Sequence, residues 1–229
     1  MFFNNKKNRK SGFTLAEVLI TLSIIGVVAV MTIPALQTHY NRQMAETRLK
    51  SFYSKMSQAH GLWLSDEHMD PKDVSYRDVT TSQQLMQWWQ DNLGRHFKAS
   101  NVQAIVNEGN QYPSMRITLL DGSAANVYIH HQGTADAAMH FFYCVDSRFC
   151  TEHLSNDTDG IHAFLFTLHQ GNDEHAPGEF ITSYAEYHGM TRDDLLANCS
   201  LPDVSRRHGC ARLIEVDNWK IRSDYPWFH

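Results

Sequence analysis

The sequence predicts an α+β fold in which one long N-terminal α-helix packs on an antiparallel β-sheet head. Three observations lead to this: a nearly uncharged apolar run from Phe13 to Ile33, an apolar stripe at helical spacing after it, and later β-rich segments separated by turn residues. The 229 residues suffice for one globular domain plus an appendage, and they contain no internal repeat. We therefore expect a basic N-terminal tip (1–12), a membrane half of the helix (13–36), an amphipathic half (37–64) and a head (65–229).

The basic tip indicates how the chain is oriented. Residues 1–12 contain four basic residues and no acid, whereas the remainder has 16 basic and 25 acidic residues. Lysine and arginine that flank a membrane segment stay in the cytoplasm. The head is then expected on the other side of the membrane.

The four cysteines agree with an exported head, because all of them follow the apolar run. Disulfides form outside the cytoplasm, and four cysteines allow three pairings. Short separations favour two pairs, and free or metal-bound thiols are the alternative, although neither pair has the two-residue gap of a zinc knuckle. The favoured pairs are Cys144 with Cys150 and Cys199 with Cys210.

The run from Phe13 to Ile33 is 21 residues long, and Glu17 carries its only charge. A helix of that length crosses a hydrocarbon core of about 30 Å. A cleaved secretory signal would place the small residue after the apolar run, whereas here Gly12 precedes it. A plain membrane anchor leaves Glu17 unexplained, because a carboxylate inside a bilayer is costly and marks a functional candidate.

Glu17 has a rationale if processing creates its partner. Cleavage between Gly12 and Phe13 would leave an α-amino group four residues before this carboxylate. The amine could pair with Glu17 of an adjacent subunit at low dielectric, where an unpaired charge is strongly disfavoured. The pair would favour assembly over dispersal in the membrane.

The segment KSGFTLAEVLITLSIIGVVAVMTIP closely resembles the N-terminus of type IV pilins and type II secretion pseudopilins. This resemblance implies a pilin-like fold, a leader that ends at Gly12, and a prepilin peptidase that cleaves there and methylates Phe13. It also implies that Glu17 is the charged assembly residue, and that the partners are other pilins or pseudopilins and an inner-membrane assembly platform. The protein would cross the bacterial inner membrane once, with its head periplasmic, and later enter a filament.

Gly26 and Pro34 match positions that bracket a stretch able to unwind in some assembled pili of this family. Glycine weakens a helix, and proline removes a backbone donor and clashes with the preceding turn. The alternative is that both are tolerated breakers, which are common in membrane helices.

Beyond Pro34, apolar residues recur every three to five positions and predict that the helix continues to about Leu64, with a core-facing stripe: Leu36, Tyr40, Met44, Leu49, Phe52, Met56, Ala59 and Trp63. Residues 65–79 are polar and predict a solvated connection. A short helix follows, with N-caps offered by residues 80–82 and an end at Gly94. Its paired Trp88 and Trp89 favour packing over a sugar or peptide site.

The firmest strand prediction is a hairpin in which Asp121-Gly122 joins RITLL to NVYIH. Further strands are expected at 140–145 and 161–168, and a last pair at 212–216 and 219–221. Residues 140–168 resemble a pseudopilin segment in outline. They depart from it in having Cys144 and Cys150 on either side of VDSRF and in having His162 after the loop.

The head offers weak evidence for chemistry. The chain has 14 histidines, but it lacks the metalloprotease helix motif, and adjacent His130 and His131 would point to opposite faces of a strand. Oxygens of Asn156, Asp157 and Asp159 could hold Ca²⁺, although the spacing is not that of an EF-hand and equally suits a plain turn. No phosphate-binding loop or recognisable catalytic base occurs, so we expect no enzyme, no metal and no other cofactor.

Three functions compete. The first is a structural pilin or pseudopilin subunit that polymerises through its N-terminal helix. The second is a minor pilin whose head binds a surface or DNA, but the acidic mature chain makes a nucleic-acid partner unlikely, and the run Arg206, Arg207, His208 is interpreted as a solvated loop. The third, a membrane-tethered enzyme or sensor, has no supporting motif.

Overall fold

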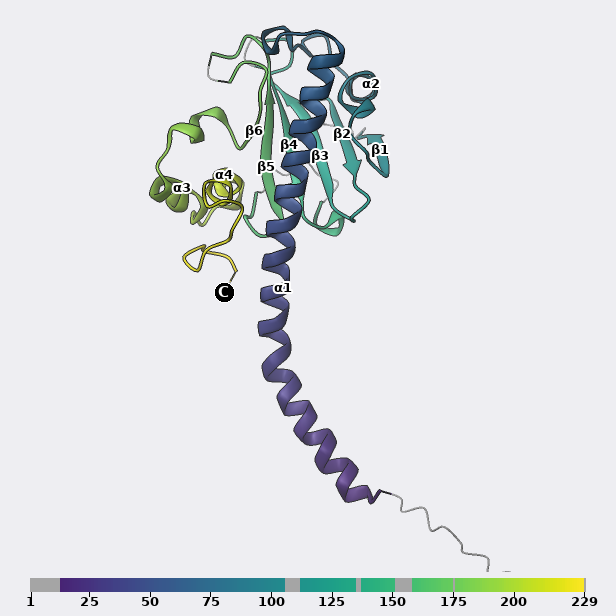
Figure 1. Ribbon diagram of the computed structural model, residues 1–229, viewed down its shortest axis with the longest axis vertical. Coiled ribbons are helices and arrows are strands. Elements are labelled where there is room, and N and C mark those ends of the chain that lie inside the picture. Colours follow the sequence, from purple (N-terminus) through teal and green to yellow (C-terminus); the bar gives the residue numbers. More distant parts are fainter. Residues whose placement is uncertain (1–12, 106–111, 135–136, 151–157, 175, 229) are drawn as a thin grey trace, which may run out of the picture. The chain divides into compact units, whose positions relative to one another are not determined.

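The computed structural model describes residues 13–105, 112–134, 137–150, 158–174 and 176–228. The chain divides into two units, residues 1–41 and residues 42–229, and each is treated by itself below. Helix α1 (Leu15–Asp66) belongs to both units and confirms the predicted long helix. The second unit contains everything that follows (Figure 1).

The second unit is built on one antiparallel sheet whose six strands lie side by side in sequence order. The predicted hairpin is confirmed: β2 pairs with β3, and Gly122 takes a left-handed conformation (φ 82°) in the connection, which glycine adopts without a Cβ clash. The strands are β1 (Asn101–Ala104), β2 (Ser114–Thr118), β3 (Ala124–His130), β4 (Ala138–Cys144), β5 (Ala163–His169) and β6 (Phe180–Thr182).

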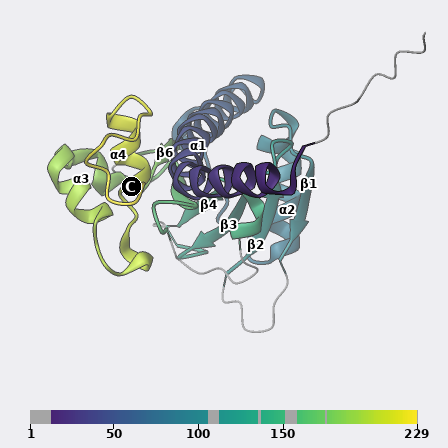
Figure 2. The same ribbon diagram turned by 90° about the horizontal axis from the view of Figure 1, so that it is seen from below.

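Helices lie along one face and both edges of this sheet. The second half of α1 covers one face, which is called the inner face below (Figure 1). Helix α2 (Ser82–Asp91) lies on the β1 side, and α3 (Arg192–Cys199) and α4 (Cys210–Val216) lie on the β6 side (Figure 2). Short 3-10 helices complete the unit at Pro71–Asp73, Leu93–Arg95, Ser147–Phe149, Ala185–Gly189 and Val204–Arg206.

The core lies between α1 and the inner face. The buried helix positions repeat at alternating steps of four and three, which keeps them on one side of the helix: Ala45, Leu49, Phe52, Met56, Ala59 and Trp63. The predicted stripe is therefore right from Leu49 onward. It is wrong for Leu36 and Tyr40, which are exposed because they precede the unit that contains the sheet.

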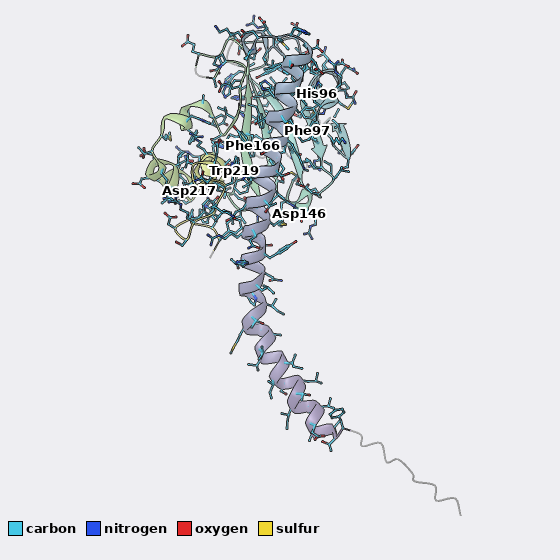
Figure 3. The ribbon with its side chains drawn as sticks, in the orientation of Figure 1. His96, Phe97, Asp146, Phe166, Asp217 and Trp219 are labelled. Atoms are coloured by element: carbon cyan, nitrogen blue, oxygen red, sulfur yellow. A yellow bond between two sulfur atoms is a disulfide. The ribbon has the colours of Figure 1, made fainter. Side chains whose placement is uncertain are left out.

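Aromatic rings fill the space between helix and sheet. Phe52 stacks on Tyr143 with ring centroids 4.2 Å apart and meets Phe166 edge-on at 5.0 Å. Tyr53, one position further along α1, contacts Phe166 and also Trp219 of the C-terminal segment, and Figure 3 labels these last two residues. The sheet and the C-terminal segment thus share one face of the helix.

Two predictions for the head are wrong. Residues 212–216 lie in helix α4 rather than in a strand, and residues 219–221 form no strand. Cys210, Leu213 and Ile214 are all buried, and a spacing of three and four places them on one helical face. A short apolar run with β-branched residues has the same composition in a strand as in a buried helix.

The region after α1 also differs from the prediction. Residues 65–79 include buried side chains, and the Tyr76 hydroxyl donates to the Leu168 carbonyl at 2.8 Å and accepts from the Met139 N–H at 3.0 Å. Helix α2 begins after Thr81 with a capping box formed by Thr81 and Gln84. It ends at Asp91 rather than at Gly94, which lies in a 3-10 turn.

Both favoured disulfides are present. Cys144 and Cys150 close a loop beyond β4, with Cα atoms 5.7 Å apart, and Cys199 and Cys210 join α3 to α4, with Cα atoms 4.9 Å apart. Cross-links of this kind stabilise a domain mainly by restricting its unfolded chain, by about 2–4 kcal/mol each. The Cys199–Cys210 disulfide joins α3 to α4, two helices that were not predicted from the sequence.

Candidate functional site

The N-terminal segment exposes a continuous apolar surface. Within α1, an 18-residue window has a mean hydropathy of 2.4, and none of it is buried inside the chain. Phe13 is 89% exposed, and the large apolar residues as far as Ile33 are exposed as well. Apolar surface of this extent indicates a membrane or a partner, and the helix fits anchoring by a single pass.

Glu17 lies at the start of α1 and is bonded to Thr14. The Thr14 N–H and the Thr14 hydroxyl both donate to Oε2 of Glu17 at 2.8 Å, and the Glu17 N–H donates to Oγ1 of Thr14 at 3.3 Å. These reciprocal bonds form a capping box, which satisfies backbone donors at a helix N-terminus. Sequence analysis missed Thr14, although the spacing Thr14-x-x-Glu17 is the signature of this motif.

The other predicted residues of the segment have simple surroundings. Gly12 lies outside the described residues, and Phe13 immediately precedes the helix. The helix continues through Gly26 and Pro34, and a Cβ added at Gly26 would meet no atom within 4 Å. Thr38 donates its hydroxyl to the Pro34 carbonyl at 3.2 Å. Local unwinding at these positions during assembly stays a prediction.

A second polar site lies on α1 in the residue 42–229 unit. Glu46 is only 8% exposed, although it carries a carboxylate and directly follows the core residue Ala45. Its carboxylate accepts the Ile221 N–H at 2.9 Å and the Lys220 ammonium at 2.8 Å. Asn218 and Trp219 both have positive φ (57° and 61°), an uncommon conformation that directs the chain back onto α1. An acidic residue beside the core stripe is the sequence signal for this site.

We expect Glu46→Ala to lower the free energy of unfolding by about 1–3 kcal/mol, because the buried Ile221 N–H loses its acceptor. Glu46→Gln keeps an oxygen for that N–H and loses the ion pairs with Lys220, whose side chain is 70% exposed, and with Arg42 at 3.7 Å, so its effect should stay below about 1 kcal/mol. Urea unfolding of the full chain in detergent, followed by tryptophan fluorescence, measures both. Equal losses in the two variants would contradict the assignment to the backbone bond.

Two comparisons identify the family. Residues 35–228 match the model of a family described as a family of unknown function (DUF6613), over more than half of the chain. The chain belongs to this family. Residues 7–33 of this DUF6613 protein match the prokaryotic N-terminal methylation motif, which confirms its recognition as a type IV pilin or pseudopilin. No curated protein and no solved structure matches it.

The oxygens proposed for calcium are partly engaged elsewhere. Asn156 and Asp157 lie outside the described residues of the DUF6613 protein. Oδ1 of Asp159 accepts three backbone N–H groups, from residues 161–163, at 2.7–2.9 Å, and Oδ2 lies 2.9 Å from Nδ1 of His162. Asp159 therefore organises the turn before β5, as the alternative interpretation expects.

The histidines that raised a metal hypothesis are distributed over several contacts. Within the described ranges, no group of three histidine, cysteine or acidic side chains is placed to hold an ion. His169 pairs with Asp173 at 2.8 Å, while His175 lies outside the described residues. The argument that His130 and His131 point to opposite faces is wrong: β3 ends at His130, His131 has a φ of 50°, and their rings are 3.9 Å apart.

The prediction that the basic run near the C-terminus is a solvated loop holds for Arg206, which is exposed, and is wrong for Arg207. Arg207 is 6% exposed, and its guanidinium lies 3.6 Å above the ring of Trp227. It donates to the carbonyls of Leu201, Asp159 and Pro202. A buried arginine that is stacked and hydrogen-bonded in this way stabilises the C-terminal segment and is not available to a phosphate backbone.

Proposed function

We propose that the DUF6613 protein is a structural subunit of a type IV pilus or a type II secretion pseudopilus and has no catalytic role. The observation that carries this proposal is the methylation motif at residues 7–33, which coincides with an exposed apolar helix. In this proposal, prepilin peptidase cleaves after Gly12, and the N-terminus of Phe13 is methylated. The mature subunit crosses the inner membrane once, with its head in the periplasm, until an assembly platform extracts it into the filament.

Assembly needs a force other than hydrophobic burial. Lipid tails are as apolar as the side chains of residues 13–33, so moving the helix from lipid into a filament core gains little from the hydrophobic effect. A charge pair between the Phe13 amine and Glu17 of a neighbouring subunit does gain free energy on assembly, because in lipid each partner would be left unpaired. The pair therefore favours the filament over the dispersed subunit.

The capping box is compatible with this second role of Glu17. Among the described contacts, both bonds from Thr14 end on Oε2. Oε1 is then the atom that could accept the amine of a neighbour, since a carboxylate has about four acceptor positions. One side chain would cap its own helix and bind the next subunit.

Mass spectrometry of the protein purified from the membrane and from sheared filaments tests the proposal. The expected N-terminal peptide begins at methylated Phe13, and it should disappear in a host without prepilin peptidase, which retains the longer precursor. The matched control is another single-pass membrane protein, whose N-terminus should not change. A mature chain that still begins at Met1, or that is absent from all filament fractions, would refute the proposal.

A further inference from the structure

The outer face of the sheet, opposite α1, carries a row of buried polar side chains. Strand register places His140 of β4 opposite Tyr128 of β3 on one side and Thr167 of β5 on the other. All three are at most 5% exposed. The next row on the same face runs from His130 through the small Ala138 to His169. The outer face therefore contains histidines where an ordinary sheet core has aliphatic residues.

His140 lies inside an aromatic cluster. Its ring centroid is 5.1 Å from Tyr128, 5.1 Å from Tyr184, 5.6 Å from His130 and 6.5 Å from Phe142. Within the described part of the chain, Nδ1 of His140 is buried without a hydrogen-bond partner, and so are Oγ1 of Thr167 and Nε2 of His169. A neutral imidazole tolerates such surroundings far better than a charged one.

Among the residues that the structure describes, none of the groups that face His140 carries a negative charge. The groups that face His140 come from five parts of the chain: Tyr128 and His130 of β3, His131 of the turn after β3, Thr167 and His169 of β5, Tyr184 of the segment after β6, and His208 of the loop before α4. Two carboxylates lie beside outer members of this group: Asp173 is already bonded to His169, and Asp203 acts on His208. Burial and the neighbouring histidines lower the pKa of His140 well below its usual value, and burial also lowers the pKa of His130 and His208.

We propose that this cluster makes the residue 42–229 unit acid-labile, because a proton taken up by His140 cannot be accommodated between Tyr128, Tyr184 and His130. Each of these neighbours is fixed by the sheet or by further ring contacts: Tyr184 packs on Tyr187 and on His208, with centroids 6.1 Å and 5.1 Å apart. Protonation therefore opens the outer face or unfolds the unit. This inference stands independently of the proposed assembly role.

The pH window follows from the sign of the shift. A histidine whose pKa is lower in the folded state contributes stability that is fully present above the unfolded value of about 6.5 and is lost as pH falls below it. Between pH 7.5 and pH 5.5, each such histidine reduces the folding equilibrium constant by up to about tenfold, or about 1.4 kcal/mol. Acid should destabilise this unit at a pH where aspartates and glutamates are still charged.

Urea unfolding of the full chain in detergent at pH 7.5 and at pH 5.5 tests the proposal with two variants. His140→Phe keeps a ring in the aromatic cluster and removes the titrating group. Between pH 7.5 and pH 5.5, the folding constant of the wild type should therefore fall by up to about tenfold more than that of His140→Phe. His68→Asn is the control, because His68 is exposed on a turn with a φ of 50°, which asparagine tolerates, and it should keep the wild-type decrease. Equal pH dependence in wild type and His140→Phe would overturn the proposal.

A measurement on the unaltered protein covers the case in which His140→Phe does not fold. Deuterium exchange at the C2 position of histidine rings, followed by mass spectrometry of peptides across pH 4–8, reports the pKa of each ring. The pKa of His140 should lie clearly below the ordinary histidine value, with slow exchange that becomes fast only when the chain unfolds. An ordinary or raised pKa at His140 would overturn the proposal as well.

Discussion

Glu17→Ala is expected to leave membrane insertion and cleavage intact and to reduce incorporation into filaments by at least about tenfold, because the Phe13 amine of the neighbouring subunit is left without a partner. The substitution also removes the acceptor of both Thr14 donors, so it weakens the helix start. The ratio of filament to membrane protein, measured by immunoblotting sheared fractions, gives the effect. Alanine alone cannot tell the two losses apart.

Two companion variants separate them. Glu17→Gln keeps an oxygen for Thr14 but removes the charge, and we expect it to assemble as poorly as alanine. Thr14→Val removes the side chain of the capping box but keeps the Glu17 charge, so it should assemble at close to the wild-type level, since losing a cap costs only about 0.5–2 kcal/mol of helix stability. If Glu17→Gln assembles normally while Thr14→Val fails, Glu17 acts as a cap and the charge-pair mechanism is wrong.

Phe52→Ala should have the largest effect on the stability of the second unit, lowering its free energy of unfolding by about 3–5 kcal/mol. The side chain is 1% exposed and contacts aromatic rings from three strands and from the segment after α2, so surrounding groups cannot collapse into the space without breaking these contacts. Urea unfolding in detergent, monitored by near-UV circular dichroism, measures the change.

The same helix supplies a matched control for Phe52. Leu62→Ala also shortens a side chain on α1, but Leu62 is 44% exposed, and its effect should be within about 0.5–1 kcal/mol. Phe52→Leu, which retains part of the volume, should lie between the two. Comparable losses for Phe52→Ala and Leu62→Ala would mean that α1 contributes to stability through its helicity rather than through its aromatic contacts.

The sequence predicts those parts of the fold in which one pattern extends over many residues. Three such features could be predicted, because each depends on spacing within a short stretch: the helical period of α1, the hairpin at Asp121-Gly122 and the two cysteine pairs. The motif at the N-terminus was equally clear, since it is contiguous. These features are local, and local chemistry determines them.

Features that depend on distant contacts were missed or wrong. The helix at Cys210–Val216 is joined to Cys199 by a disulfide and buries Leu213 and Ile214, and these contacts with other parts of the chain are not visible in its local sequence. Arg207 is buried where Trp227 stacks on it and where carbonyls of distant segments accept its hydrogen bonds. Glu46 and His140 are ordinary polar residues in the sequence. Only the folded chain brings the Ile221 N–H to Glu46, and only the folded chain surrounds His140 with Tyr128 and Tyr184.

The contact between Glu46 and Ile221 joins positions 175 residues apart. Contacts of such long range form late and slowly, because a large loop must close before they contribute. The first helix therefore cannot complete its surroundings until residues 219–221 have been made and delivered to the same compartment. A subunit in which residues 219–221 have not yet docked would expose more of Tyr53 and would leave the Glu46 carboxylate with only Arg42 as its ion-pair partner.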